Sequence, residues 1–197
     1  MVERQRVYLI AGLGNPGSEY TNTRHNAGFL VIDTLAAWHK IAVERSKFNV
    51  LYGRGRIYGV DVLLAKPLSY MNRSGPPLRQ FADYFRIQHE AMVIVHDDID
   101  LAYERLKIKE KGGDGGHKGI RSLIEAFGGD QFVRLRVGVG RSQSGDDVVG
   151  HVLGKFGSDE RSSIEDFLKK AAAAIETILL KGTKEGMNRF NQKPALT

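Results

Sequence analysis

The residues that could carry out chemistry begin with His25, in the segment Thr-Arg-His-Asn-Ala-Gly at positions 23–28. This segment follows a polar stretch and starts an apolar helical pattern, so His25 is expected at an exposed helix start. By position alone, that is more typical of an ordinary histidine than of a catalytic one. His39 and His89 stand in polar positions near element ends, and His151 has no neighbouring acid. A chemical role for His25 therefore requires a partner that orients it.

The most suitable partner lies in the acidic run His-Asp-Asp-Ile-Asp at positions 96–100. This run directly follows an apolar segment, so it is expected at the carboxyl end of a strand, where sites of α/β proteins commonly form. A carboxylate bonded to an imidazole fixes its tautomer and stabilises the imidazolium, so the free nitrogen can take a proton from water. The same acids, with His25 or His117, also suit a divalent metal ion. The local sequence leaves both sites open.

Water is the simplest nucleophile that this sequence offers. Cysteine is absent. Ser69 and Ser74 are the best-placed hydroxyl groups, but neither stands in the Gly-x-Ser-x-Gly motif of serine hydrolases. The side-chain amides of Asn15 and Asn72 could position a carbonyl group for attack, or could simply form turns. We therefore expect hydrolysis by water that a histidine activates.

Two glycine-rich segments match parts of nucleotide-binding motifs without their context. Residues 12–17 have the spacing Gly-x-Gly-x-x-Gly, but polar residues 18–23 separate them from the next helix, and Asp33 lies inside that helix instead of after a second strand. Residues 112–119 contain Gly-His-Lys where a P-loop requires Gly-Lys-Ser or Gly-Lys-Thr. We expect no dinucleotide site. The second segment is expected either to present amides to an anion or to form a loop with positive φ angles.

Six Lys and Arg side chains form what we call the basic ridge. They occupy alternate positions of two expected strands and so project from one face of each; they are Arg105, Lys107, Lys109, Lys111, Arg134 and Arg136. The chain has 29 Lys and Arg residues against 23 Asp and Glu residues, a net charge of +6. A row of cations matches phosphates by charge rather than by base identity, so the ridge favours a nucleic acid partner over a plain solvated sheet face.

The elements that must position these residues alternate between strand and helix patterns. Strands are expected at 6–13, 48–57, 60–66, 91–95, 105–111 and 132–139, and helices at 24–40, 74–86, 117–127 and 158–181. Pro76 and Pro77 suit the start of the second helix, and Ser158 and Gly182 are expected to cap and end the last one.

The strand and helix order predicts an α/β fold, a single three-layer domain over residues 1–197 with a mixed β-sheet flanked by helices. The sheet is expected to be mixed because Tyr58 and Gly59 join two strands as a hairpin. The pattern does not decide whether residues 184–197 are ordered.

Composition argues against several classes of protein. No apolar run approaches the roughly 18 residues of a membrane span, and the N-terminus lacks the pattern of an export signal. Without cysteine, the chain cannot form disulfides, iron–sulfur clusters or thiolate zinc sites. We expect no membrane partner and a cytoplasmic location.

A set of short motifs runs in order through nearly the whole chain. They are Gly-Leu-Gly-Asn-Pro-Gly (12–17), Tyr20, Thr-Arg-His-Asn-Ala-Gly (23–28), Lys-Pro-Leu-Ser-Tyr-Met-Asn-Arg-Ser-Gly (66–75), His-Asp-Asp-Ile-Asp (96–100), Gly-Gly-His-Lys-Gly (115–119), Arg-Leu-Arg-Val-Gly-Val-Gly (134–140) and Val-Val-Gly-His-Val-Leu-Gly (148–154). As a set they resemble the bacterial-type peptidyl-tRNA hydrolases. The resemblance implies hydrolysis of the ester that joins a peptide to the 3′ ribose of tRNA, by a monomer without metal or cofactor.

The resemblance also implies roles for single residues. His25 would activate water, Asp97 would keep His25 oriented and basic, and Asn15 would contact the peptide near the ester and help reject free aminoacyl-tRNA. Further contacts to the substrate and to the 3′ end and acceptor stem of the tRNA would come from Tyr20, Tyr70, Met71, Asn72, His117, Lys118, Lys107, Lys109 and Arg136.

Lys118 departs from the family, which usually has asparagine at this position. An amide both accepts and donates hydrogen bonds, whereas an ammonium only donates, so Lys118 is expected to contact phosphate or a developing oxyanion instead.

Two other classes of function compete with the hydrolase: a non-catalytic RNA-binding relative, and a metallohydrolase that uses the acidic run. Turnover would exclude the first, and activity that survives a chelator would exclude the second.

Overall fold

A mixed β-sheet forms the centre of the molecule in the computed structural model, which describes residues 6–141 and 147–192. In the order β2-β3-β4-β1-β5-β7-β6, its strands are Arg45–Lys47, Val50–Ile57, Val60–Pro67, Tyr8–Gly12, Met92–Asp98, Val133–Gly138 and Leu106–Lys109. Strands β4, β1, β5 and β7 are parallel, whereas β3, β2 and β6 join the sheet by antiparallel pairing. The mixed sheet expected from the hairpin is therefore confirmed.

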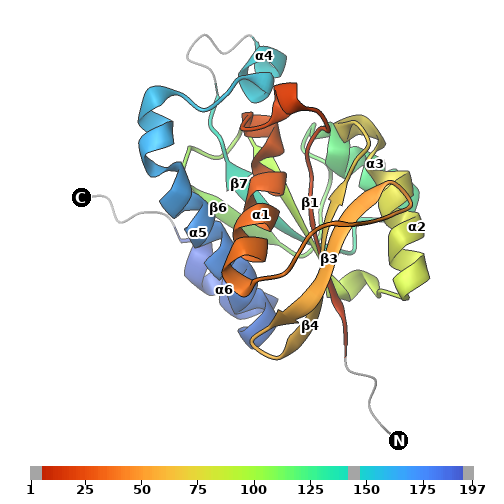
Figure 1. Ribbon diagram of the computed structural model, residues 1–197. Coiled ribbons are helices and arrows are strands. Elements are labelled where there is room, and N and C mark those ends of the chain that lie inside the picture. Colours follow the sequence, from red (N-terminus) through yellow and green to blue (C-terminus); the bar gives the residue numbers. More distant parts are fainter. Residues whose placement is uncertain (1–5, 142–146, 193–197) are drawn as a thin grey trace, which may run out of the picture.

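Helices cover both faces of this sheet. They are α1 (Ala27–His39), α2 (Gly75–Phe85), α3 (Lys118–Phe127), α4 (Val148–Leu153), α5 (Ser158–Lys181) and α6 (Thr183–Phe190), with the short 3₁₀ turns η1 (Ser18–Tyr20), η2 (Arg24–Asn26), η3 (Met71–Arg73) and η4 (His89–Ala91). Helices α1, α5 and α6 pack on one face, and α2 and α3 pack on the other (Figure 1). The expected three-layer α/β architecture is confirmed.

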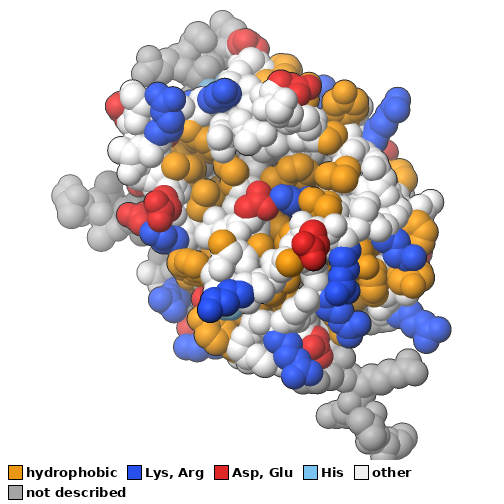
Figure 2. Space-filling view, in the orientation of Figure 1, with side chains coloured by type: hydrophobic (Ala, Val, Ile, Leu, Met, Phe, Trp, Pro, Cys, Tyr) orange, Lys and Arg blue, Asp and Glu red, His pale blue; other side chains and the backbone are white. Residues whose placement is uncertain are grey.

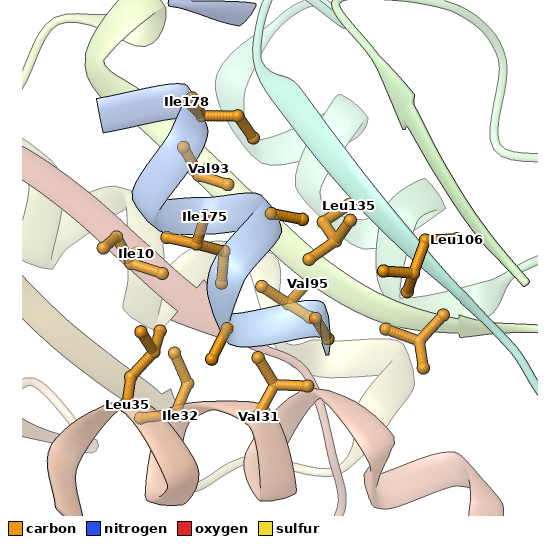
Figure 3. Close-up of a cluster of buried hydrophobic side chains, with 14 of the residues drawn as sticks. Ile10, Val31, Ile32, Leu35, Val93, Val95, Leu106, Leu135, Ile175 and Ile178 are labelled. Atoms are coloured by element: carbon orange, nitrogen blue, oxygen red, sulfur yellow. The ribbon is translucent and has the colours of Figure 1, made fainter. Parts of the chain in front are cut away.

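The larger core cluster lies between the sheet and the pair α1 and α5. Figure 3 shows Ile10, Val93 and Val95 of the central strands pointing toward Ile175 of α5 and Ile32 of α1. All of these side chains are almost fully buried. Burying an aliphatic side chain of this size contributes about 1.5–3 kcal/mol, so this cluster holds the strand ends in fixed positions.

The structure corrects several expected boundaries. The segment expected as strand from residue 48 begins with a turn: Phe48 and Asn49 have φ angles of 51° and 58° and join β2, which the sequence did not predict, to β3. Helix α1 starts at Ala27, because residues 24–26 form η2. Gly157, not Ser158, caps α5, and the Glu160 side chain accepts the Gly157 N–H at 2.6 Å.

The C-terminal segment is structured as far as it is described. Helix α6 packs on β6, and the side chain of Asn191 pairs with the backbone of Ile108, accepting its N–H at 2.7 Å and donating to its C=O at 3.0 Å. This side chain occupies the free edge of β6. Residues 193–197 lie outside the described part. Within that part, no helix has the length and apolar character needed to cross a membrane.

Candidate active site

A cleft of about 550 Å³ opens at the carboxyl ends of the parallel strands. Its floor comes from the end of β5, and its sides come from the loop after β1, the turns η2 and η3, the glycine-rich loop before α3, and α4. This is the sheet edge where α/β proteins commonly place their sites. Lys109 of β6 and Arg134 and Arg136 of β7 also line it, so eight separate parts of the chain converge on one volume.

Two glycines set His25 against the strand ends. A Cβ on Gly28 would come within 2.5 Å of the backbone oxygens of Leu13 and Val95, and one on Gly12 would come within 2.5 Å of the Gly28 carbonyl carbon. Only glycine permits this close approach of α1 to β1. Gly12, the first glycine of the segment 12–17, therefore serves the packing of α1 against β1.

His25 and Asp97 are in direct contact at the floor of the cleft. The Nδ1 atom of His25 lies 3.0 and 2.9 Å from the two carboxylate oxygens of Asp97. The Asp97 side chain is 2% exposed and the His25 side chain 13%. Because Nδ1 is committed to the carboxylate, Nε2 is the atom of His25 left for other chemistry. The orienting acid, which the acidic run left undefined, is Asp97.

His117 is a second partner of the same carboxylate. Its Nε2 lies 2.9 Å from Oδ1 of Asp97, and its Nδ1 accepts the backbone N–H of Ile120 at 3.2 Å, which caps α3. A nitrogen that accepts from an N–H carries no proton, so Nε2 is the protonated nitrogen and donates to Asp97. Burial raises the pKa of Asp97, but His117 and His25 outweigh burial and hold it far below its ordinary value.

His96 lies behind these residues and is neutral. Its Nδ1 donates to the carbonyl of Asp97 at 2.7 Å, and its ring meets that of His117 edge-on at 4.6 Å. Burial lowers the pKa of His96 well below its ordinary value, and the nearby His117 lowers it further. The sequence placed His96 in the acidic run without a role of its own.

Asn15 is fixed on both sides of its peptide unit. Its N–H donates to the side-chain carbonyl of Asn26 at 2.8 Å, and its C=O accepts from the Asn26 amide at 3.0 Å. Its side-chain Oδ1 accepts the N–H of Met71 at 2.7 Å. This assignment leaves the Nδ2 amide of Asn15 as a donor toward the cleft. Asn26, which the sequence did not single out, is the residue that positions it.

The glycine-rich loop takes its shape from Arg134. This side chain is 3% exposed and donates to the carbonyls of Gly112 and Gly113, the latter at 2.7 Å. Gly112, Gly115 and Gly116 have φ angles of 134°, 59° and 81°, so the positive-φ loop that the sequence allowed is present. The loop also borders the cleft, where it carries His117 and Lys118.

The basic ridge is only partly as expected. Strand β6 covers residues 106–109 and not 105–111, so Arg105 and Lys111 lie outside it. Lys107 pairs across the sheet with Arg136, and Lys109 with Arg134. Arg134 is buried against the glycine-rich loop and is no exposed phosphate ligand, while Arg136 forms an ion pair with Asp98.

The ridge lies on the sheet face that carries α2 and α3, because its neighbours Leu106, Ile108 and Leu135 belong to the core cluster on the opposite face. On the face drawn in Figure 2, Lys and Arg are instead interspersed with acidic and apolar side chains.

Most of the residues expected in the site line the cleft. They are Asn15, His25, Tyr70, Met71, Asn72, Asp97, Lys109, His117, Lys118 and Arg136. Tyr20, in η1, and Lys107, on the exposed side of β6, are not lining residues. The sequence did not identify the apolar side chains of α4, although their motif at 148–154 was part of the resemblance; nothing in their type suggested a cleft.

His25, Asp97 and His117 bring possible metal-ligating atoms within 4.8 Å of one another. Nε2 of His117 would have to lose its proton to bind a metal, and Nδ1 would then have to give up its bond to Ile120. Without His117, only His25 and Asp97 would remain as ligands, so the three side chains are better described as a hydrogen-bonded cluster than as a metal site. Fold and site together define the class: a three-layer α/β protein with a histidine–carboxylate site at the ends of its parallel strands.

Comparison with known proteins identifies the family within this class. The family model described as peptidyl-tRNA hydrolase matches residues 9–196, and the chain belongs to this family. Peptidyl-tRNA hydrolases of Bacillus subtilis and Clostridium novyi are 48% and 45% identical, over 94% of this chain and 98% of each relative. A crystal structure of the enzyme from Acinetobacter baumannii has a TM-score of 0.88 and 40% identity, covering 97% of both chains. The expected family and the expectation of an enzyme are both confirmed.

Proposed function

We propose that this chain hydrolyses the ester between a peptide and the 3′ ribose of peptidyl-tRNA, which releases the peptide and recycles the tRNA. One observation carries the proposal: an imidazole oriented by a buried carboxylate, at 2.9 Å, forms the floor of a cleft in a member of this family. Such a pair is suited to moving a proton to and from water, which ester hydrolysis requires.

In the proposed reaction, Nε2 of His25 takes a proton from water while the oxygen attacks the ester carbonyl carbon. Nδ1–H remains bonded to Asp97, whose charge stabilises the imidazolium. The tetrahedral intermediate then breaks its bond to the 3′ oxygen, which takes the proton back from Nε2. The products are the free peptide acid and the tRNA 3′ hydroxyl, and His25 returns to its starting state.

Asn15 supports this reaction as a donor. With Oδ1 occupied by Met71, its Nδ2 amide can donate to a peptide carbonyl or to the oxyanion that develops during attack. A free aminoacyl ester has a charged ammonium in place of the acylated nitrogen. An amide donor repels such a group, so we propose that Asn15 helps to select blocked substrates.

We propose that the protein is a cytoplasmic monomer, as the resemblance implies, and that its reaction uses no metal ion. The support for a metal-free reaction is the hydrogen bonding of His117, whose Nδ1 accepts from Ile120 and whose Nε2 proton faces Asp97. This tautomer binds the carboxylate and not a cation. A chelator should therefore leave the rate unchanged, and added zinc should not raise it.

The basic side of the cleft is proposed to hold the tRNA. Lys109 and Arg136 line it, and the exposed Lys107 extends it along β6 toward the 5′ phosphate and acceptor stem. Lys118 is the first residue of α3, after the glycine-rich loop, and is proposed to contact a phosphate of the 3′ end. Tyr70, Met71 and Asn72 border the opposite side, and Tyr20 is proposed as a more distant contact to tRNA.

The decisive experiment compares N-acetyl-aminoacyl-tRNA with aminoacyl-tRNA in the presence of a chelator. We expect rapid release of the acetylated amino acid, much slower release from the unblocked ester, and almost complete loss of both with His25→Ala, because general base catalysis contributes about 10²- to 10⁴-fold. Wild-type turnover that His25→Ala retains would contradict the mechanism. Binding of tRNA without turnover would identify a non-catalytic relative.

A further inference from the structure

One side of the cleft is apolar and comes from a single short helix. We call it the α4 wall, and its side chains are Val148, Val149, Val152 and Leu153. Val149 is 57% exposed, although it is apolar, and it lines the cleft. Exposed apolar side chains in a cleft are suited to burying an apolar part of a substrate. In peptidyl-tRNA, the apolar atoms near the ester are those of the peptide side chains.

The α4 wall needs outside support to keep its shape. Helix α4 has six residues, too few to be stable without tertiary contacts. Asp147 caps its first turn by accepting the Gly150 N–H at 2.7 Å, and His151 donates to the carbonyl of Val139 at 3.1 Å. At its other end, the N–H of Gly154 donates to the carbonyls of Gly150 and His151 at 2.9 and 3.2 Å.

Arg24, the residue next to His25, binds the end of α4 and the segment that follows it. One terminal nitrogen of its guanidinium donates to the carbonyl of His151 at 3.3 Å and to that of Lys155 at 2.9 Å. Its other two nitrogens bind both carboxylate oxygens of Glu160 in α5, at 3.1 and 2.5 Å. A planar guanidinium can make these bonds together, whereas an ammonium cannot.

The backbone strengthens the same connection. The N–H of Arg24 donates to the carbonyl of Gly154 at 3.0 Å, and Thr23 forms an antiparallel bridge with Lys155. Arg24 and His25 share the turn η2, so no flexible residue separates the guanidinium from the catalytic imidazole. These bonds connect the end of α4 and the residues after it directly to the turn that carries His25.

We infer that Arg24 is a positioning residue that ties the α4 wall to His25, and that the wall receives an apolar side chain next to the scissile ester. This inference rests on the proposed function and assigns to it a preference for apolar acyl groups. An apolar side chain on the wall holds α4 in place, and through Arg24 the turn with His25 as well. The consequence is coupling between acyl-group binding and alignment of the base.

The test uses one tRNA that carries either N-acetyl-leucine or N-acetyl-glycine. We expect wild-type kcat/KM to favour the leucyl ester by at least about tenfold, as apolar pockets discriminate. Arg24→Lys keeps the charge but loses the planar contacts. For the leucyl ester it should lower kcat and raise KM, so that kcat/KM falls about tenfold or more. The kcat/KM of the glycyl ester should change far less, so the ratio of the two kcat/KM values should move toward one.

Arg79→Lys is the matched control, because Arg79 pairs with Asp83 on the surface of α2, away from the cleft. It should keep the wild-type ratio. Val149→Ser, which makes the wall itself more polar, should reduce the leucyl preference as Arg24→Lys does. Equal losses on both esters with Arg24→Lys, or an unchanged ratio, would show that Arg24 has only a structural role and would overturn the inference.

Binding of the free products separates this inference from the proposed reaction. Titration with N-acetyl-leucine and N-acetyl-glycine requires no turnover. Tighter binding of N-acetyl-leucine, lost in Arg24→Lys, would support the wall even if no ester were hydrolysed, a result that would reject only the reaction. Equal binding of both acids by the wild-type protein would reject the wall.

Discussion

Asp97 is shared between two histidines, and its two oxygens satisfy an N–H from each. A carboxylate can do this because all its lone pairs accept, whereas an amide of the same shape has one accepting oxygen and one donating nitrogen. Because both carboxylate oxygens accept, His25 carries its proton on Nδ1. The two histidines in turn keep Asp97 ionised, since both lower its pKa against the effect of burial.

Asp97→Asn should therefore lower kcat by about 10²- to 10⁴-fold with a small change in KM. In the variant, an amide N–H must face one of the two histidines, so His25 and His117 can no longer both keep an acceptor for their protons. Asp100→Asn is the control, because Asp100 is exposed and pairs with Arg141. Initial rates on N-acetyl-aminoacyl-tRNA provide the measurement; if both variants kept wild-type kcat, Asp97 would have no part in the reaction.

His96 should make the folded protein sensitive to acid. Its pKa is lowered by burial, so below the ordinary value of about 6.5 the unfolded chain binds a proton that the folded chain does not. The free energy of unfolding is then largest above pH 6.5 and falls with decreasing pH, by up to about 1.4 kcal/mol per unit from this group.

Urea unfolding of wild-type protein and His96→Phe between pH 8 and 5 measures this contribution. Above pH 7, the free energy of unfolding should depend on pH in the same way in both proteins. Below pH 6.5, it should fall less steeply with decreasing pH in the variant, because phenylalanine does not titrate. Parallel curves over the whole range would mean that His96 makes no contribution to the acid sensitivity.

Among the elements, α1 is positioned by close backbone packing at its first turn. Gly28→Ala would bring a methyl group within 2.5 Å of the oxygens of Leu13 and Val95, atoms that cannot move without disturbing β1 and β5. We expect destabilisation of at least about 1–3 kcal/mol, together with loss of activity from displacement of η2. Gly129→Ala is the control, because a Cβ there meets nothing within 4 Å. Thermal and urea unfolding check the expectation; similar midpoints for the two variants would contradict it.

Sequence patterns predicted the long elements well and the short ones poorly, for a physical reason. Helix α5 and the hairpin of β3 and β4 have strong periodicity and clear turn residues, and their expected and observed limits nearly coincide. Strand β2 has three residues, none of them buried, so its sequence shows no apolar alternation. The basic strand was expected too long, because alternation continues past the last paired residue at Lys109.

In the site, residue types indicated His25, Asn15 and the acidic run, and the resemblance pointed to Asp97. Only the tertiary contacts show that Asp97 is the acid that meets His25. Asn26 and Arg24 act through backbone carbonyls and amides brought from distant segments, at 2.8 Å for Asn26 and 2.9 Å for Arg24. No local spacing encodes such contacts. Burial of Arg134 was likewise invisible in a pattern that treats every second residue as exposed.

At the scale of the whole molecule, the cleft lies between two different edges of the sheet. The floor of the cleft lies at the end of the central β5, with β6 and its basic side chains at one edge of the sheet and β2 and β3 at the other. A tRNA held along β6 and β7 would reach the floor with its 3′ end. Affinity for such a partner comes largely from displaced counterions, so it should fall with salt.

Lys107 tests whether this edge is where the tRNA lies. It is exposed on β6 and forms no ion pair among the described residues, so Lys107→Gln should remove one phosphate contact and reduce the slope of log affinity against log salt by about 0.9 for a duplex stem. Arg54→Gln removes the same charge from β3, near the opposite edge, and should leave the slope nearly unchanged. Binding of tRNA to inactive His25→Ala protein at several salt concentrations gives both slopes. Equal reductions would attribute affinity to net charge, and a larger effect of Arg54→Gln would place the acceptor stem on the other side of the cleft.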